Sequence, residues 1–253
     1  MADSDDDSTK TLEEGDIFFL YRPDVENRDP DSLSDVQRFY MVLRPRGGKH
    51  VRLTVIGDKK LPDVDSHQRF WGFVDMVTND GSKIEKELRA ETYDTKTRGE
   101  RFQPAARPAG EGSYAFISPG GEDMHLVYVL EYPKSPGEVQ KAFNIEDKGA
   151  FVLSIKNPEK PSPPGAGLDA DRAADYPKSL QKEFAGRRFA PCDPHLLDYE
   201  GAQFVLIGAR ANPERAYNVD IDADISGKPD IFTKLKMTHS RHPIEPLFEG
   251  EWA

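Results

Sequence analysis

The sequence predicts a β-rich α+β protein, built from two tandem, related units that are each mostly antiparallel and carry a few short helices. Short runs of β-branched and aromatic residues recur between Gly, Pro and Asp residues, which is typical of strands. Most connections between these runs lack a long helical crossover, so antiparallel pairing is expected. The same order of elements returns in the second half of the chain, which indicates an internal repeat.

The first unit is predicted to span residues 13–95 and to contain four strands followed by a helix. Its strands are expected in the runs 16–22, 37–44, 51–62 and 69–77. The helix is expected at residues 82–90, because Ile84 and Leu88 lie one helical turn apart behind Ser82. Residues 1–12 are expected to be disordered, because their aspartates repel one another and offer nothing to bury.

The second unit, residues 108–253, repeats this order. Its strands are expected in the runs 113–118, 124–132, 151–161 and 203–209, and its closing helix at 228–237. Two short helical insertions are predicted at 135–143 and 176–184. In the first of them Ser135 and Glu138 have capping-box spacing and Pro136 takes the first helical position. The Pro- and Gly-rich residues 157–177 are expected to form a long surface loop, whose role the sequence leaves open.

Each unit is expected to pack its sheet around apolar residues from its own strands. The first set is Phe18, Tyr40, Val55 and Phe73, and the second is Phe116, Tyr128, Leu153 and Val205. Because similarity this thin can arise by chance between any two β-rich segments, one mixed domain with a coincidental likeness is the alternative to a true duplication.

The charge balance argues against nucleic acid and membrane partners. Acidic residues outnumber basic ones by 45 to 34, which gives a formal net charge of −11 and opposes binding to nucleic acid or anionic lipid. No apolar stretch approaches the roughly 20 residues that a membrane-spanning helix needs. The single Cys192 cannot form an internal disulfide and the acidic start differs from a signal peptide, so a cytoplasmic protein is expected.

Three acids alternate at Asp220, Asp222 and Asp224, and along an extended segment their side chains would share one face. Such a face can gather a hard cation such as calcium. However, Ile225 stands where the EF-hand pattern requires glycine, so the pattern does not match. The alternative is a solvated edge whose charges discourage strand pairing.

A zinc site and the common catalytic motifs are weakly supported. Cys192 and His195 have the spacing of zinc ligands, as do His239 and His242, but the two pairs are far apart in the sequence. Isolated histidines near proline are more often surface or capping residues. No nucleophile elbow, phosphate-binding loop or dinucleotide fingerprint occurs. We therefore expect no metal and no cofactor.

The segment 96–107, which joins the two units, concentrates basic residues in an otherwise acidic chain. We predict that Arg98, Arg101 and Arg107 face a groove between the units and bind an anion, because guanidinium groups match carboxylate and phosphate geometry. The alternative is that these arginines pair with acids of the flanking units and only fix their packing.

Several runs of the sequence carry a resemblance to a known family. These are "VQRFYMVLRP", "RFWGFVDMV", "TRGER", "ARPAGEGSY", "KGAFVLSIKNP" and "LDYEGAQFVLIGA". They resemble an uncharacterised family of β-rich proteins from bacteria, plants and fungi with no established activity. The resemblance implies that residues 13–210 are a natural unit, and it implies no active-site residues. Some similar fungal sequences carry a BTB-type transcription-factor label, but that fold needs a helical cluster that this strand-rich sequence lacks.

Two functions follow from these patterns. The first is a non-enzymatic binding or scaffold protein whose ligand is an anionic small molecule or an acidic segment of a partner protein. It is favoured because no nucleophile with a base, and no convincing metal set, is present. The alternative is a hydrolase for an anionic phosphate or carboxylate substrate, with Asp193, His195 or Asp198 as acid–base groups.

Overall fold

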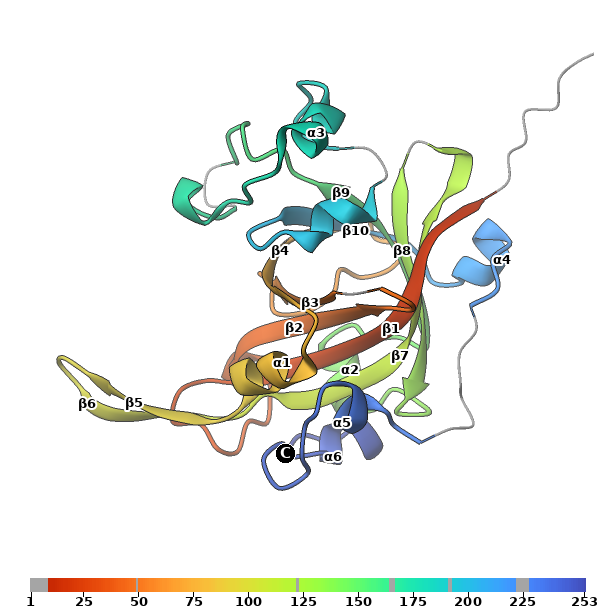
Figure 1. The fold of residues 1–253 in the computed structure, drawn as a ribbon. Coiled ribbons are helices and arrows are strands. Elements are labelled where there is room, and N and C mark those ends of the chain that lie inside the picture. The colour runs from red at the N-terminus through yellow and green to blue at the C-terminus, as the bar shows by residue number, and fades with distance from the viewer. Residues whose placement is uncertain (1–8, 49, 122, 164–166, 191–192, 222–227) are drawn as a thin grey trace, which may run out of the picture.

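The computed structural model describes residues 9–48, 50–121, 123–163, 167–190, 193–221 and 228–253, and its central feature is a closed barrel of eight strands (Figure 1). The barrel strands are β1 (Lys10–Pro23), β2 (Val36–Pro45), β3 (Val51–Ile56), β4 (Arg69–Thr78), β7 (Arg107–Ser118), β8 (Met124–Tyr132), β9 (Lys148–Ile155) and β10 (Gln203–Arg210). The α-helices are short: α1 (Gly81–Leu88), α2 (Glu138–Ala142), α3 (Lys178–Gln181), α4 (Pro213–Tyr217), α5 (Ile231–Lys234) and α6 (Glu245–Phe248). The predicted β-rich class with a few short helices is confirmed.

The barrel is closed by both halves of the chain together. The strands β1 to β4 lie side by side in order, as do β7 to β10, and the two groups join where β1 pairs with β7 and β4 pairs with β10. All of these strand pairs are antiparallel, as predicted. Because the halves share one sheet, their description as two related units stays a prediction.

Aromatic side chains fill the barrel interior, which is therefore a packed core. Phe39 stacks on Phe19 with ring centroids 6.1 Å apart, and on Phe143 at 4.8 Å. On another part of the wall Tyr128 stacks on Phe151 at 6.2 Å. Phe143 directly follows α2, so this helix contributes to the core alongside the strands.

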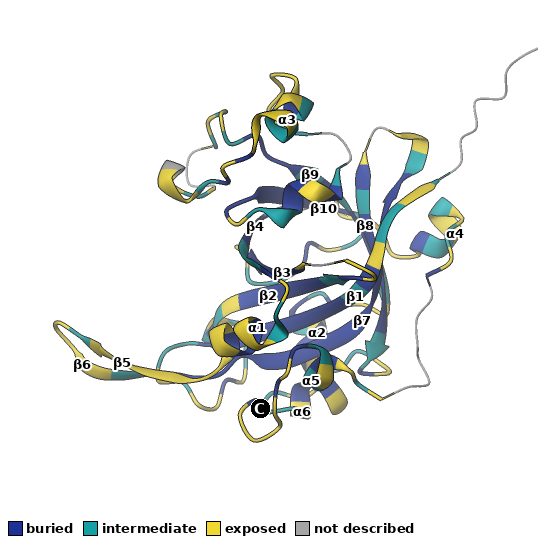
Figure 2. Ribbon diagram, in the orientation of Figure 1, coloured by how far each residue is buried: buried dark blue, intermediate teal, exposed yellow. Residues whose placement is uncertain are grey.

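A second core covers the outer face of β1, β2 and β3. Phe18 and Tyr40 point outward from the barrel and belong to one cluster with Ile84 of α1, Ile231 of α5 and Leu247 of α6. The strands are consequently buried on both faces, and Figure 2 shows them in dark blue while much of the surrounding helices and loops is exposed. This outer core places α1 and the C-terminal helices next to each other.

The predicted core residues lie on different faces of the barrel. Phe18, Tyr40, Val55 and Phe73 belong to the outer cluster, whereas Phe116, Tyr128 and Leu153 belong to the interior. Val205 is buried outside both clusters. This differs from the prediction that each set forms the core of its own unit. The reason is that residues 17–21 of β1, for example, are an unbroken run of buried apolar residues, so the sequence has no polar alternation there to distinguish the faces.

The predicted linker at residues 96–107 is instead part of a hairpin. The strands β5 (Glu91–Thr95) and β6 (Gly99–Gln103) pair with each other in a separate two-stranded sheet, which projects from the barrel (Figure 1). Gly99 adopts a positive φ of 70° in its turn, a conformation that favours glycine. The last linker residue, Arg107, begins β7 and so belongs to the barrel wall.

The predicted helices form at the expected positions in the sequence, but they are shorter than predicted. The side chain of Asp80 caps α1 by accepting the N–H of Ser82. The first insertion helix, α2, begins after Gly137, two residues later than the predicted cap at Ser135. The predicted helix at 228–237 contracts to the four residues of α5. Within the described ranges, no helix is long and apolar enough to cross a membrane.

Candidate anion-binding site

The three arginines predicted to form a clamp lie in different surroundings. Arg98 is exposed in the turn between β5 and β6, where its backbone N–H donates to Thr95. Arg101 on β6 forms an ion pair with Glu26, with Nε 3.2 Å from the carboxylate. Arg107 is 5% exposed at the start of β7. Arg107 lines a hollow whose described lining includes neither Arg98 nor Arg101, so the structure does not bring the three together there.

Arg107 is a buried cation with unused hydrogen-bonding capacity. Its Nη2 donates to the backbone carbonyl of Arg28 at 2.6 Å, but its Nε and Nη1 have no hydrogen-bond partner among the described residues. Burial lowers the pKa of Arg107, and the neighbouring Tyr21, Asp29 and Glu245 oppose this shift through their charges. An arginine stays protonated in proteins, so this buried charge remains.

Two further arginines share a hollow with Arg107. Arg28, Arg107 and Arg241 line a cavity of about 210 Å³, which we call the arginine pocket; its other walls are Ala90, Phe102, Pro104, Ala105 and Pro243. The guanidinium carbon of Arg28 lies 4.1 Å from the centroid of the Phe102 ring, a cation–π contact that orients it. Among the described residues, the lining therefore combines three guanidinium groups with apolar walls and includes no carboxylate.

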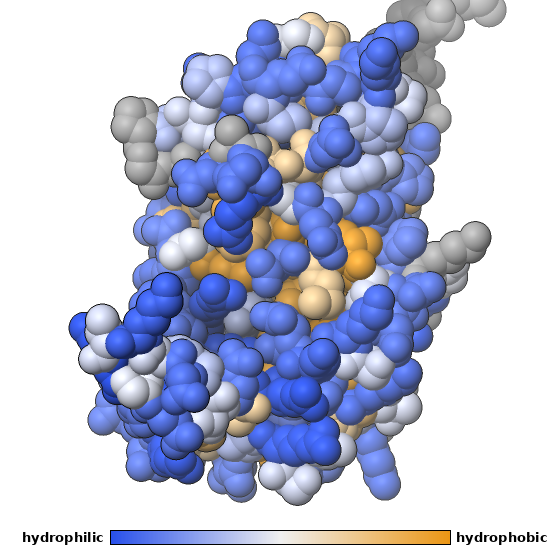
Figure 3. All heavy atoms as spheres, turned by 60° about the vertical axis from the view of Figure 1, so that its left-hand side comes forward, coloured by the Kyte–Doolittle hydropathy of each residue, from blue (hydrophilic) through white to orange (hydrophobic). Residues whose placement is uncertain are grey.

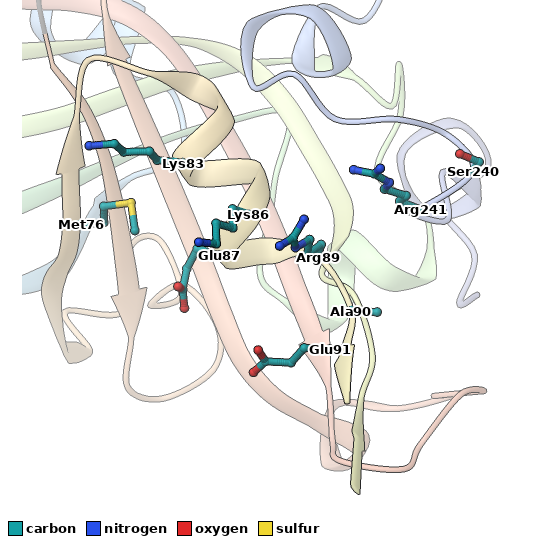
Figure 4. A pocket seen from close by; sticks show the side chains of 9 residues that line it. All are labelled: Met76, Lys83, Lys86, Glu87, Arg89, Ala90, Glu91, Ser240 and Arg241. Carbon is teal, nitrogen blue, oxygen red and sulfur yellow. The ribbon is translucent and has the colours of Figure 1, made fainter. Parts of the chain in front are cut away.

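A larger hollow of about 940 Å³ adjoins the arginine pocket (Figure 4). We call it the α1 groove; it is lined by Met76, Lys83, Lys86, Glu87, Arg89, Ala90, Glu91, Ser240 and Arg241. Ala90 and Arg241 line both hollows, which makes the two contiguous. Four of the lining residues are basic and two are acidic. The region is thus locally basic in a chain of net charge −11.

Most residues of this site are not predicted from the sequence. Lys83, Lys86 and Arg89 follow one another at three-residue spacing, which places them on one side of a helix and was a detectable signal. No sequence pattern connects Arg28 or Arg241 with Arg107, because they come from distant parts of the chain and meet only through the fold.

Hydrogen bonds hold the wall between the two hollows in place. The buried Arg22 donates to the backbone carbonyls of Glu87, Arg89 and Pro104, which ties the end of α1 to the base of the hairpin. The N–H of Ala106 donates to the carbonyl of Leu88 at 2.7 Å. Both ends of the hairpin are therefore anchored beside the barrel, and the wall they form is preorganised.

The segment that carries Arg241 is fixed from two sides. The ring of His242 is buried and its Nδ1–H donates to the carbonyl of Ala106 at 2.8 Å. Arg241 itself pairs with Glu85 of α1, with Nη1 3.0 Å from Oε1. Burial lowers the pKa of His242, so the ring adds little positive charge at neutral pH. The charge of Arg241, by contrast, is partly matched by Glu85.

The residues of the hydrolase alternative lie elsewhere, where a turn meets β1 and β3. His195 and Asp198 belong to the 3₁₀ helix Pro194–Asp198, and His195 Nδ1 lies 3.4 Å from Asp198 Oδ2. They line a hollow of about 280 Å³ together with Glu13, Arg52 and His50. Arg52 donates to both oxygens of Glu13, at 2.6 and 2.9 Å, and to Asp198 at 2.8 Å.

The polar side chains around Arg52 are explained by a structural role, because they form hydrogen bonds with one another. The buried Arg52 uses its donors on two carboxylates, and Tyr114 donates to Glu13 at 2.7 Å, so the polar groups satisfy one another. Asp193 is occupied in capping the turn, where it accepts the N–H of His195 at 2.8 Å. The described lining contains no serine, threonine, cysteine or lysine as a nucleophile.

The structure describes only some of the residues that form the predicted metal-binding patterns. Cys192, Asp222 and Asp224 lie outside the described residues. His239 stacks on Phe232 with ring centroids 4.0 Å apart, and His242 is bonded to the backbone. Across the described ranges, no group of three or more His, Cys, Asp or Glu side chains is arranged to hold a metal ion.

The face turned forward in Figure 3 is mostly hydrophilic, with apolar side chains gathered near its centre. A hollow of about 340 Å³ lies beside β4 and β10 and is lined by residues that include Trp71, Phe73, Asp58 and Gln203. Its described lining carries one acid and no basic residue, so an anion finds no cationic partner there. The arginine pocket and the α1 groove are therefore better candidates than this hollow.

The fold and the site define this chain as an antiparallel eight-stranded barrel protein with a basic groove beside the barrel. Comparison with known proteins gives no closer assignment: no family model, no curated protein and no solved structure matches the chain.

Proposed function

We propose that this protein is a non-enzymatic binding protein that holds an anionic ligand, either a small molecule or an acidic segment of a partner, in the arginine pocket and the α1 groove. The observation that carries the proposal is Arg107, a buried guanidinium with two donors unpaired among the described residues. An unsatisfied buried donor costs about 1–3 kcal/mol, more when charged, and an anion that accepts from it recovers this energy.

Local charge explains how an acidic chain attracts an anion. The repulsion from the net charge of −11 acts at long range and is screened beyond roughly 8 Å at physiological salt. Hydrogen bonds from guanidinium groups act at contact distance, and low-dielectric walls such as Phe102 and Pro104 strengthen them. Glu87 and Glu91 weaken the field of the α1 groove, so the arginine pocket is the stronger of the two subsites.

Thermal unfolding at low salt tests the proposal. Sulfate, phosphate and small dicarboxylates are expected to raise the melting temperature, by an amount that corresponds to about 2.7 kcal/mol when the anion is at 100 times its Kd. Arg107→Lys keeps the charge but loses the planar fork, and it should reduce the rise. Arg98→Ala is the matched control, because Arg98 is exposed in the hairpin turn and should not matter.

One further variant, which carries two substitutions, makes the result decisive. If Arg107→Lys does not fold, the exposed Lys83→Ala and Lys86→Ala changes on α1 can be combined, and this variant should also respond less to anions than the wild type. A wild-type protein whose melting temperature is unmoved by every anion would contradict the proposal. Equal responses of the wild type and both the arginine and lysine variants would place the anion elsewhere.

A hydrolase remains the second candidate, and the pairing of His195 with Asp198 at 3.4 Å favours it. In this mechanism Asp198 orients the ring, and the other ring nitrogen of His195 accepts a proton from a water that attacks a phosphate or carboxylate ester. Screening phosphatase and esterase substrates, with and without divalent metal, tests this function. Turnover that His195→Ala abolishes would support the hydrolase; no turnover on any substrate would leave the binding protein.

A further inference from the structure

We infer that the arginine pocket is specific for the dianion of a phosphomonoester, over carboxylates, sulfate esters and phosphodiesters. The inference rests on the proposed function and adds the chemical class of the ligand. The phosphoryl group would occupy the pocket lined by Arg28, Arg107 and Arg241, and the body of the ligand would extend into the α1 groove, which is open and contiguous with the pocket.

The charge of the pocket favours a dianion. Arg241 is paired with Glu85. Among the described residues, Arg28 forms no ion pair, and Arg107 donates only to the backbone carbonyl of Arg28. Asp29 and Glu245 act on Arg107 through their charges only. Two cations are therefore without a bonded carboxylate. A phosphomonoester carries a charge of about −1.5 to −2 at pH 7, which matches them better than a single negative charge.

The number and position of donors also favour a phosphoryl group. Three guanidinium groups from β7, the loop after β1 and the segment before α6 border one small cavity. A terminal phosphoryl group has three oxygens that accept hydrogen bonds in different directions, whereas a carboxylate has two in one plane. A phosphodiester carries a single negative charge and keeps only two terminal oxygens, so it matches three guanidinium groups less well.

The same chemistry occurs on a phosphorylated side chain of a protein and on a small phosphorylated metabolite. Lys83, Lys86 and Arg89 in the adjoining groove would contact additional acidic groups of either ligand. The test therefore has one arm for each source: a phosphoserine peptide with flanking acidic residues, with its unphosphorylated form as the control, and a nucleoside monophosphate.

Titration calorimetry with four probes that share an aromatic body tests the selectivity. Phenyl phosphate is expected to bind about tenfold more tightly than phenyl sulfate, benzoate or methyl phenyl phosphate near pH 7.5. The second pKa of a phosphomonoester is about 6, so its advantage over phenyl sulfate should shrink to about twofold near pH 5. Phenyl sulfate does not change charge in this range, so it controls for pH effects on the protein.

Protein variants locate the binding. Arg28→Ala removes an exposed side chain at the rim of the pocket, is expected to fold, and should erase the preference for phenyl phosphate. Arg98→Ala should leave it intact. Equal binding of all four probes would overturn the phosphomonoester inference while leaving anion binding in place. Failure of every anion to bind would overturn both, and a preference that survives in Arg28→Ala would show that the pocket is not its origin.

Discussion

Glu111 on β7 holds Ile231 at the start of α5, because its Oε2 accepts the backbone N–H of Ile231 at 3.0 Å. Its other oxygen accepts the N–H of Asp230 at 2.7 Å. Burial raises the pKa of Glu111 to about 7, although these two hydrogen bonds and Lys234 oppose the shift. One carboxyl group thus connects the barrel to the C-terminal segment that carries Arg241.

Glu111→Gln is expected to flatten the pH dependence of stability. The pKa of Glu111 is raised from 4.5 to about 7 on folding, so the folded state binds the proton more tightly. Its contribution to stability is complete below about pH 4.5 and is lost as the pH rises to about 7, by at most roughly 3 kcal/mol. Urea unfolding of both proteins across this range measures the difference, and parallel curves would show that Glu111 does not titrate there.

Arg52→Met is expected to destabilise the protein by about 3–5 kcal/mol, because it leaves the carboxylates of Glu13 and Asp198 facing each other without a cation. Adding Glu13→Gln and Asp198→Asn should recover part of the loss. Urea unfolding measures all three proteins. For comparison, Arg101→Ala breaks the more exposed pair with Glu26 and should cost less than about 1 kcal/mol. Similar losses for Arg52→Met and Arg101→Ala would contradict this account.

The sequence predicted the barrel strands well because their burial is strong. Runs such as residues 37–44 and 124–132 are rich in β-branched and aromatic residues, and both became strands. The hairpin β5–β6 was not predicted, because "ETYDT" and "GERFQ" are largely exposed and have no apolar alternation. Closure of a barrel depends on β1 pairing with β7 and β4 with β10, and a local pattern carries no information on such distant pairs.

From the sequence, only one residue of the arginine pocket, Arg107, is predicted. Arg107 was singled out because it lies in a basic segment, and the structure places it in the wall of a pocket. Arg98 and Arg101 belong to the same segment, but the hairpin carries one to an exposed turn and directs the other to Glu26. Proximity in sequence does not ensure proximity in space once a segment folds into a projecting hairpin.

Gly112→Ala is expected to destabilise the barrel by more than about 3 kcal/mol, because a Cβ at this position would overlap the backbone carbonyl of Val129 on β8. The backbone can relieve this overlap only by separating β7 from β8. Gly99→Ala is the matched control: its Cβ would enter open space, and only its positive φ costs energy, about 1–2 kcal/mol. Thermal unfolding ranks the two variants, and a milder effect for Gly112→Ala would contradict the close approach of β7 and β8.

The two subsites are expected to differ in their response to salt. Lys83 and Lys86 are exposed, so their attraction for an anion falls as the Debye length shortens from about 30 Å at 0.01 M to about 8 Å at 0.15 M. Arg107 is buried and is screened much less. Removing the two lysines should therefore weaken phenyl phosphate binding at low salt and have little effect at physiological salt, whereas Arg107→Lys should weaken it at both. Calorimetric Kd values for the three proteins at the two salt concentrations test this, and an equal salt dependence of both variant effects would mean that the arginine pocket is as exposed to solvent as the α1 groove.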